Sequence, residues 1–324
     1  MIGSVINRAG GWLEQWITRR QTPRRGATAL DRRRVYILPT GYGYVFAIIL
    51  IVLFLWAVNY NNSMGFALTF LLAATAMNAM WRSNVNLVGL TLHPVRVEPV
   101  FAGHEARFGY RVENPDRQPR YAVVLTLPGS SSQSGNLSGR GSELYTLTLA
   151  AERRGYLRPG RLRIDTRFPL GLFEAWSWVT FDQRCLVYPA PVGQQSLPSG
   201  QQSEAGSGGE TGSGSEDYAG LRSYAPGDSP RHVAWKAAAR DDNLLVKRFT
   251  GQASPDLWLD WAAVAAADTE ARLSQLCRWV LQADRQGRDY GLRLPGVTIE
   301  PASGERHYRR CLEALALYGK RDEH

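Results

Sequence analysis

The longest apolar pattern in the chain lies near its start. Residues 35–81 form 47 consecutive positions without Asp, Glu, Lys, Arg or His. That length allows two helical membrane crossings of about 20 residues each. The pattern predicts spans at roughly Tyr42–Val58 and Met64–Trp81, and the short polar turn between them forces a helical hairpin within residues 35–82. A hairpin buried in a soluble core is the alternative, but such a core rarely supplies so uniform an apolar surface.

After the hairpin the pattern changes to short runs in which apolar and polar residues alternate. Six or seven such runs, separated by Pro, Gly and Asn, fill residues 83–192. In one of them Phe108, Tyr110 and Val112 fall on one face, and charged residues fall on the other. This alternation is typical of a strand that has one buried face and one solvent-exposed face. The spacing of the runs predicts an antiparallel β-sandwich domain.

The next segment has a composition typical of a linker. Residues 193–214 contain seven Gly, five Ser and four Gln. A chain this poor in apolar residues cannot offset the entropy of ordering, so we expect a flexible linker. Its Gly-Ser repeats do not end in Gly-Lys-Ser or Gly-Lys-Thr, and they therefore do not indicate a phosphate-binding loop.

Residues 215–324 show strands that alternate with helices. LLVKRFTG, LWLDW, YGLRLPG and VTIEP read as strands. A helix is predicted from about Thr269 to Gln286, with Gly287 as its stop. One face of that helix is apolar, formed by Leu273, Leu276, Val280 and Ala283. A final helix would be capped by Ser303, and the alternation favours a small parallel or mixed sheet.

The distribution of charge sets the orientation that we expect in the membrane. The formal net charge is +9, of which eight Arg, Glu14 and Asp31 place +6 in residues 1–34. Arg32, Arg33 and Arg34 precede the first span, Arg82 follows the second, and the turn between the spans has no Lys or Arg. The positive-inside rule then places both termini and the soluble domains in the cytoplasm, at the inner membrane. The basic juxtamembrane segment 1–34 is read either as a helix lying on the anionic leaflet or as an unstructured tail.

Candidate chemistry is sparse in this sequence. Cys185, Cys277 and Cys311 lack the spacing of metal ligands and read as small buried hydrophobes in a reducing compartment. The sequence has no Gly-x-Ser-x-Gly elbow and no His-Glu-x-x-His motif. The sharpest enzyme hypothesis is His232 as a general base beside Asp228. We predict no cofactor, no metal and no enzymatic activity.

The densest polar stretch is YAPGDSPRHVAWKAAAR, residues 224–240. Asp228 precedes Ser229 and Pro230, which predicts a helix start near residue 230. Acidic and basic residues nearly balance here, which suggests an internal network that joins the segment after the linker to the α/β region. Its residues are Glu216, Arg222, Tyr224, Gly227, Asp228, Arg231, Trp235, Lys236 and Arg240. A basic nucleic-acid-binding face is the alternative, and the net charge of only +3 in residues 82–324 argues against nucleic acid.

Two segments carry a resemblance to a known family. GSEDYAGLRSYAPGDSPRHVAWKAAARDDNLLVKRF and ERRGYLRPGRLRIDTRFPLGLFEAW are similar to the two motifs of the domain of unknown function 58 (DUF58) family, which are membrane-anchored bacterial proteins. With the hairpin, the resemblance runs from about residue 35 to the end. It implies an α+β membrane protein with a transmembrane hairpin, a β-sandwich and a small α/β region resembling part of a von Willebrand factor type A domain.

The resemblance also implies partners and a role. Members of the family are usually encoded beside a MoxR-type AAA ATPase and often beside a transglutaminase-like membrane protein. An adaptor or assembly factor for cell-envelope complexes, acting by protein–protein interaction, is the role this implies. Metal-binding type A domains use Asp-x-Ser-x-Ser after the first strand, whereas this chain has DWAAV from Asp260. Because both hydroxyls are missing, we expect no metal there.

Overall fold

The structure is a computed structural model that describes residues 26–198, 218–223, 245–249, 257–266 and 268–320. The chain divides into two compact units, Met1–Ala190 with Leu315–His324, and Pro191–Ala314. The described residues contain four α-helices and several mainly antiparallel sheets. The expected mixture of helices and sheets is therefore confirmed.

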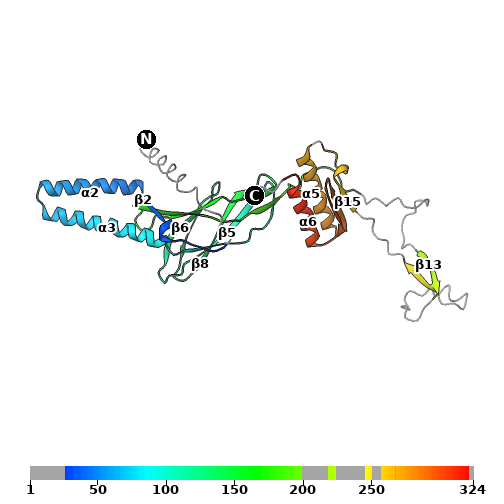
Figure 1. The fold of residues 1–324 in the computed structure, drawn as a ribbon, viewed down its shortest axis with the longest axis horizontal. Coiled ribbons are helices and arrows are strands. Elements are labelled where there is room, and N and C mark those ends of the chain that lie inside the picture. Colours follow the sequence, from blue (N-terminus) through cyan, green and yellow to red (C-terminus); the bar gives the residue numbers. More distant parts are fainter. Residues whose placement is uncertain (1–25, 199–217, 224–244, 250–256, 267, 321–324) are drawn as a thin grey trace. The chain divides into compact units, whose positions relative to one another are not determined.

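Two long helices begin the first unit. Helix α2 spans Gly41–Asn59 and helix α3 spans Ser63–Leu87, and the two lie side by side and project from the sheets (Figure 1). Both were predicted, but α3 runs on to Leu87 instead of ending near Trp81. Its last turns are polar, and they are held by bonds from Ser83 to a loop and from Asn86 to the second sheet.

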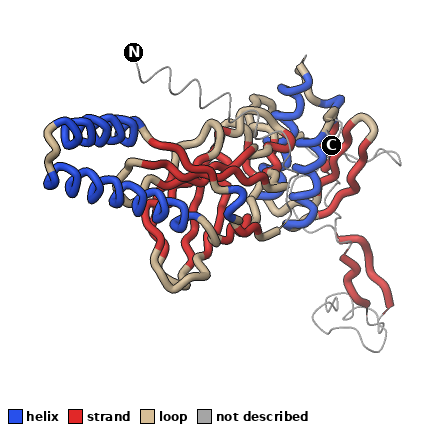
Figure 2. Tube along the Cα trace, turned by 60° about the vertical axis from the view of Figure 1, so that its left-hand side comes forward, coloured by secondary structure: helices blue, strands red, loops and turns tan. Residues whose placement is uncertain are grey.

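The described strands of the first unit, which are red in Figure 2, belong to three sheets. The first has the order β1 (Thr28–Ala29), β3 (Thr91–Pro94), β5 (Glu105–Glu113) and β8 (Ser142–Ala150). The second has the order β2 (Tyr36–Pro39), β11 (Phe173–Thr180), β10 (Arg161–Thr166), β6 (Arg120–Thr126) and β7 (Gln133–Leu137). The third joins β4 (Val100–Phe101), β12 (Cys185–Tyr188) and β9 (Gly155–Leu157), and its β4–β12 pair is parallel.

The first two sheets share one apolar core. Phe108, Tyr110 and Val112 of β5 are buried in it, and so are Leu125 of β6 and Ile164 of β10. The predicted alternation along β5 is therefore confirmed. Two antiparallel sheets around one core are consistent with the expected β-sandwich.

Strands β2 and β7 are two of the strands that the sequence pattern did not predict. Strand β2 lies within the apolar run that we assigned to the hairpin, and it pairs with β11, where Tyr36 faces Trp176. Apolar residues that continue directly into a helix hide such a strand, since periodicity cannot separate the two. Strand β7 has the sequence QSGNL, which lacks apolar alternation, and only its pairing with β6 makes it a strand.

The second unit contains a three-stranded mixed sheet with helices. Strands β15 (Leu257–Asp260) and β16 (Tyr290–Leu294) are parallel, and β17 (Val297–Ala302) is antiparallel to β16. Helix α5 spans Thr269–Arg285, and its predicted apolar face is fully buried, as expected. Gly287 follows α5 with a φ of 62°, the left-handed conformation of a helix stop. Helix α6 spans Glu305–Leu317, so Gly304, not Ser303, directly precedes it.

Two further strands flank the densest polar stretch of the sequence. Strand β13 (Tyr218–Ser223) pairs antiparallel with β14 (Leu245–Phe249), and β14 is the strand predicted from LLVKRFTG. Residues 224–244 between them lie outside the described part of the chain.

The start of the predicted linker packs on α5. The Gln275 side chain of α5 donates from Nε2 to the Gln195 carbonyl at 3.0 Å and accepts from the Gln195 amide at 3.1 Å. Trp279 Nε1 donates to the same carbonyl at 3.1 Å. These contacts hold the first residues of the segment, and residues 199–214 lie outside the described part of the chain.

Candidate functional site

The most unusual surface among the described residues belongs to the α2–α3 hairpin. Both helices are long and apolar enough to cross a membrane, and only about a tenth of each apolar window is buried. Ile48, Val52 and Leu55 of α2 are each 60% exposed. A soluble helix usually has one apolar face, whereas α2 is apolar on all sides. Among the residues that the structure describes, none covers this apolar surface.

Aromatic side chains lie at both ends of the hairpin. Trp56 and Tyr60 are exposed beside the turn, and Tyr42, Tyr44 and Trp81 are exposed at the base. At 1.5 Å per residue the 19 residues of α2 extend about 28 Å, close to the thickness of a hydrocarbon layer. Trp and Tyr favour the two interfaces of such a layer, where an amphipathic ring meets both water and lipid.

The hairpin is closed by close packing and by a capped turn. An added Cβ on Gly65 would lie 3.0 Å from Ala57 and from Trp56, so glycine permits this close approach of the helices. The Gly65 amide donates to Asn62 Oδ1 at 3.1 Å, which caps the start of α3. Close contacts of this kind are how helices associate where no water drives them together.

A loop of the β-sheet unit clamps the start of α2. Thr40 caps α2 by accepting from the Gly43 amide at 3.2 Å, and its hydroxyl donates to the Gly171 carbonyl at 2.5 Å. The Thr40 amide donates to the Leu172 carbonyl at 2.9 Å. A Cβ on Gly43 would lie 2.1 Å from that same carbonyl oxygen. The Pro-x-Gly-Leu-Phe segment of the sequence is therefore part of the hairpin's base.

The end of α3 is bound to the second sheet through Asn86, which is 4% exposed. Its side-chain amide donates to the Tyr121 carbonyl at 2.7 Å and to Thr166 Oγ1 at 2.9 Å. Its side-chain oxygen accepts from the Tyr121 amide at 3.0 Å. One turn earlier, Ser83 donates to the Phe168 carbonyl at 2.6 Å. These bonds attach the last turns of α3 to the second sheet and to the loop after β10.

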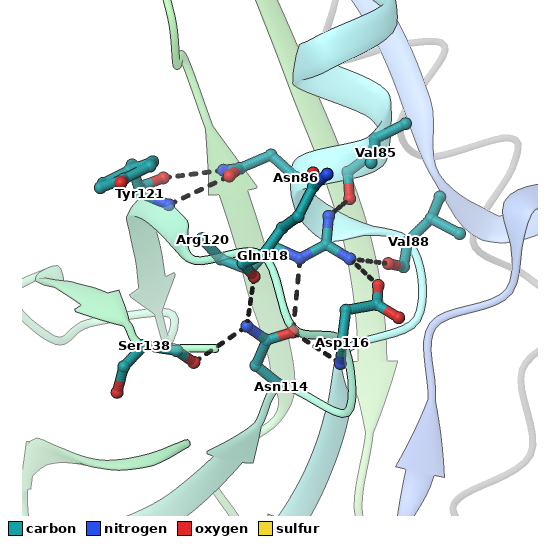
Figure 3. Close-up of polar contacts among 9 residues, drawn as sticks. All are labelled: Val85, Asn86, Val88, Asn114, Asp116, Gln118, Arg120, Tyr121 and Ser138. Carbon is teal, nitrogen blue, oxygen red and sulfur yellow. Dashed lines mark hydrogen bonds and ion pairs between the residues drawn. The ribbon is translucent and has the colours of Figure 1, made fainter. Parts of the chain in front are cut away.

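Arg120 completes this junction and is 3% exposed (Figure 3). Its guanidinium donates to the Val85 carbonyl, and to the Val88 carbonyl at 3.4 Å. These carbonyls belong to the end of α3, where no further helical turn supplies donors and a cation is favoured. Asp116 neutralises the guanidinium through an ion pair. A buried charge is stable only when it is paired in this way.

Asn114 shapes the turn that presents Arg120. Its side chain donates to the carbonyls of Gln118 and Ser138 at 2.8 and 3.0 Å, and accepts from the Asp116 amide at 3.2 Å (Figure 3). It also accepts from Arg120 Nε at 3.4 Å. From sequence alone, Asn114 is one of the Asn residues that separate the predicted strands. A polar run, RSNVN, that continues an apolar helix was the available signal for the junction.

The predicted network around residues 216–240 falls almost wholly outside the described residues. Of its nine members only Arg222 lies in a described element, strand β13. His232 and Asp228, the predicted acid–base pair, also lie outside the described residues. These residues stay predictions from sequence.

A close pair of buried groups, His307 and Cys311, lies on helix α6 beside strand β16. His307 Nε2 lies 3.4 Å from Cys311 Sγ and 2.7 Å from the Tyr290 carbonyl. All three residues are buried, and burial raises the pKa of the Cys311 thiol to about 12. The thiol is therefore protonated at neutral pH, and a thiol in that state is a poor nucleophile. Cys185 and Cys277 are buried as well, as expected.

Asp260 is the last residue of β15 and the first of the DWAAV stretch. Asp260 Oδ1 accepts from the Ala262 amide at 2.9 Å and so caps the short 3-10 helix Trp261–Ala263. Within the described residues no group of three or more His, Cys, Asp or Glu is arranged to hold a metal ion.

Comparison of the chain with protein families and with curated proteins finds no match in either set.

Proposed function

We propose that this chain is a membrane-anchored interaction module whose hairpin crosses the inner membrane. The observation that carries the proposal is the exposed apolar surface of α2 and α3, bordered by aromatic residues at both ends. Burial of that surface in lipid removes its contact with water. The free energy of transfer is favourable by about 25 cal/mol per Å² of apolar surface buried. The β-sandwich and the α/β region, which resembles part of a von Willebrand factor type A domain, then stand in the cytoplasm.

The junction supports a role in holding partners at a defined place. Asn86 and Arg120 bind the end of α3, and the loop around Gly171 binds the start of α2. Because both ends of the anchor are fixed, the first unit keeps a set orientation to the bilayer. A fixed orientation favours docking of a partner, because less conformational entropy of the anchored unit is lost when the partner binds.

The partner in this proposal comes from the resemblance to the DUF58 family. It is a MoxR-type AAA ATPase, together with a transglutaminase-like membrane protein, and the chain acts as their adaptor or assembly factor. The surface proposed for docking includes the segment from Glu216 to Arg240.

The test is purification of the full tagged chain from mildly solubilised membranes, with and without ATP. We expect the chain to resist carbonate extraction and to co-purify an AAA ATPase in a nucleotide-dependent manner. Asp228→Ala should weaken the capture because the sequence predicts Asp228 to cap a helix and to pair with a cation, while His232→Ala should retain it. Loss of capture in His232→Ala at unchanged stability would favour the acid–base role instead, and release by carbonate would contradict the anchor.

A further inference from the structure

A groove lies at the base of the hairpin, between helix α3 and a loop of the β-sheet unit. Its volume is about 530 Å³, within the range of small-ligand sites. Three residues of the loop, Phe168, Pro169 and Leu170, form one wall. The other wall is a stripe of α3 formed by Leu71, Ala74, Thr75, Asn78, Ala79 and Arg82.

The groove changes in polarity along its length. Leu71 and Ala74 make one end apolar, Asn78 is intermediate, and Arg82 makes the other end cationic. Leu71, Asn78 and Arg82 recur at helical spacing, so they line one side of α3. An elongated ligand with an apolar tail and an anionic head matches this gradient.

Arg82 is free to bind an anion. It is exposed, and its Nε donates to Asn78 Oδ1 at 3.2 Å, which orients the guanidinium. Among the residues that the structure describes, no acidic side chain lies within ion-pair distance of Arg82. Arginine recognises phosphate through two parallel hydrogen bonds.

The loop wall is built before any ligand arrives. The Phe168 ring packs at a tilt against Tyr121, with ring centroids 4.9 Å apart, and the Phe168 carbonyl accepts from Ser83. The Gly171 amide donates to the Arg167 carbonyl at 2.9 Å, which closes the loop. Leu170 nevertheless remains 55% exposed at its tip. A fixed loop with an exposed leucine beside an apolar helix is suited to contact acyl chains.

The geometry points to a binding site for one anionic phospholipid, with its acyl chain along Leu71, Ala74 and Leu170 and its phosphate on Arg82. The site rests on the proposed membrane placement and adds a ligand to it. Arg82 is the first charged residue after the uncharged run, which is the level at which a span meets lipid headgroups.

The test is native mass spectrometry of the full chain released from detergent micelles, with phosphatidylglycerol or phosphatidylcholine added. We expect preferential retention of one phosphatidylglycerol. Arg82→Gln should weaken this binding about tenfold, since a charge-assisted hydrogen bond is lost. Arg33→Gln is the matched control, because Arg33 is an exposed arginine that precedes α2 and does not line the groove.

A second pair of variants tests the apolar part of the groove. Thr75→Trp fills the groove and should abolish retention, whereas Met77→Trp, at an exposed position of α3 outside the groove, should not. Equal binding of the two lipids, or equal effects of Arg82→Gln and Arg33→Gln, would overturn the site. Displacement of the lipid by inorganic phosphate alone would show an anion site without an acyl chain, which also contradicts the inference.

Membrane extraction separates this inference from the proposed function. A chain that stays in carbonate-washed membranes but shows no preference for phosphatidylglycerol keeps its anchor and lacks the site. A chain that carbonate releases has neither.

Discussion

Asn86 is a polar side chain at the end of an apolar helix, and all its hydrogen bonds go to the sheet below. Its three bonds satisfy the Tyr121 amide, the Tyr121 carbonyl and the Thr166 hydroxyl. A buried polar group that loses its partner costs more than an average hydrogen bond contributes. A substitution at this position therefore also leaves polar groups of strands β6 and β10 without a hydrogen-bond partner.

We predict that Asn86→Leu lowers the free energy of unfolding by about 1–3 kcal/mol, because the Tyr121 amide loses its hydrogen-bond partner. Asn84→Leu is the control, since Asn84 is half-buried, two residues away on the same helix, and makes none of these bonds. Denaturant unfolding of the full chain in detergent measures both. Equal stability of the two variants would contradict the role given to Asn86.

Asp165 is a carboxylate within strand β10 whose environment opposes its charge. Burial raises the pKa of Asp165 above its ordinary value of 3.8, although the Arg163 guanidinium, 3.3 Å away, acts in the opposite direction. A raised pKa means that the folded state binds the proton more tightly than the unfolded state. The contribution of Asp165 to the free energy of unfolding is then complete below the ordinary pKa of the carboxyl group. It is lost as the pH rises through the pKa that Asp165 has in the folded state.

Because the pKa of Asp165 is raised, we predict that Asp165→Asn is more stable than the wild type at pH 7. The uncharged amide has no charge to desolvate. The advantage should shrink as the pH falls towards the ordinary pKa of the carboxyl group. Melting temperatures measured between pH 7 and pH 4 give the comparison. A variant that is less stable at pH 7 would mean that the ion pair with Arg163 outweighs burial.

At the scale of the elements, the hairpin's base depends on the close approach of α2 to the loop after β10. Gly43 has no side chain, and the Leu172 carbonyl occupies the place that a Cβ would take. Gly41, two residues earlier, has open space around it. The sequence alone does not distinguish the two glycines, because they differ only in the atoms that surround them in the folded chain.

Gly43→Ala should therefore destabilise the chain by about 1–3 kcal/mol, as an overpacked contact does. Gly41→Ala should be neutral or slightly stabilising, because alanine has the higher helix propensity. Thermal unfolding in the same detergent compares the pair. A neutral Gly43→Ala would show that the loop moves away from α2 at little cost.

For the whole molecule the distribution of charge decides the expected orientation. Arginines flank the hairpin at its base, and the turn at residues 59–63 carries no charge. Retention of basic residues on the cytoplasmic side sets the orientation of short hairpins.

A reporter fused after His324 should accordingly be active only in the cytoplasm, and one inserted after Asn61 should be active only on the other side. Enzymatic reporters that fold in one compartment alone measure both positions. Activity of the His324 fusion outside the cytoplasm would overturn the orientation proposed for the soluble units.

Local pattern was enough to predict many of the elements. The apolar run located α2 and α3, the alternation along β5 identified its buried face, and the apolar face of α5 with Gly287 behind it located that helix. Each of these signals is repeated over many residues of one segment, so neighbouring positions support one another.

The candidate site was hidden from that kind of reasoning. Asn86, Arg120 and Gly171 are far apart in the sequence, and each alone reads as an ordinary helix, strand or turn residue. Strands β2 and β7 were missed for a related reason, since their partners across the sheet make them strands.

The apolar hairpin, the basic flanks and the order of the main elements were predictable from the chain alone, because they depend on composition and on periods within one segment. The end of α3, the polar residues that bind it to the sheets, and the groove beside Arg82 became visible only in the folded chain. Those features depend on which distant segments meet, and the contacts between them are satisfied, or left open, only once the chain has folded.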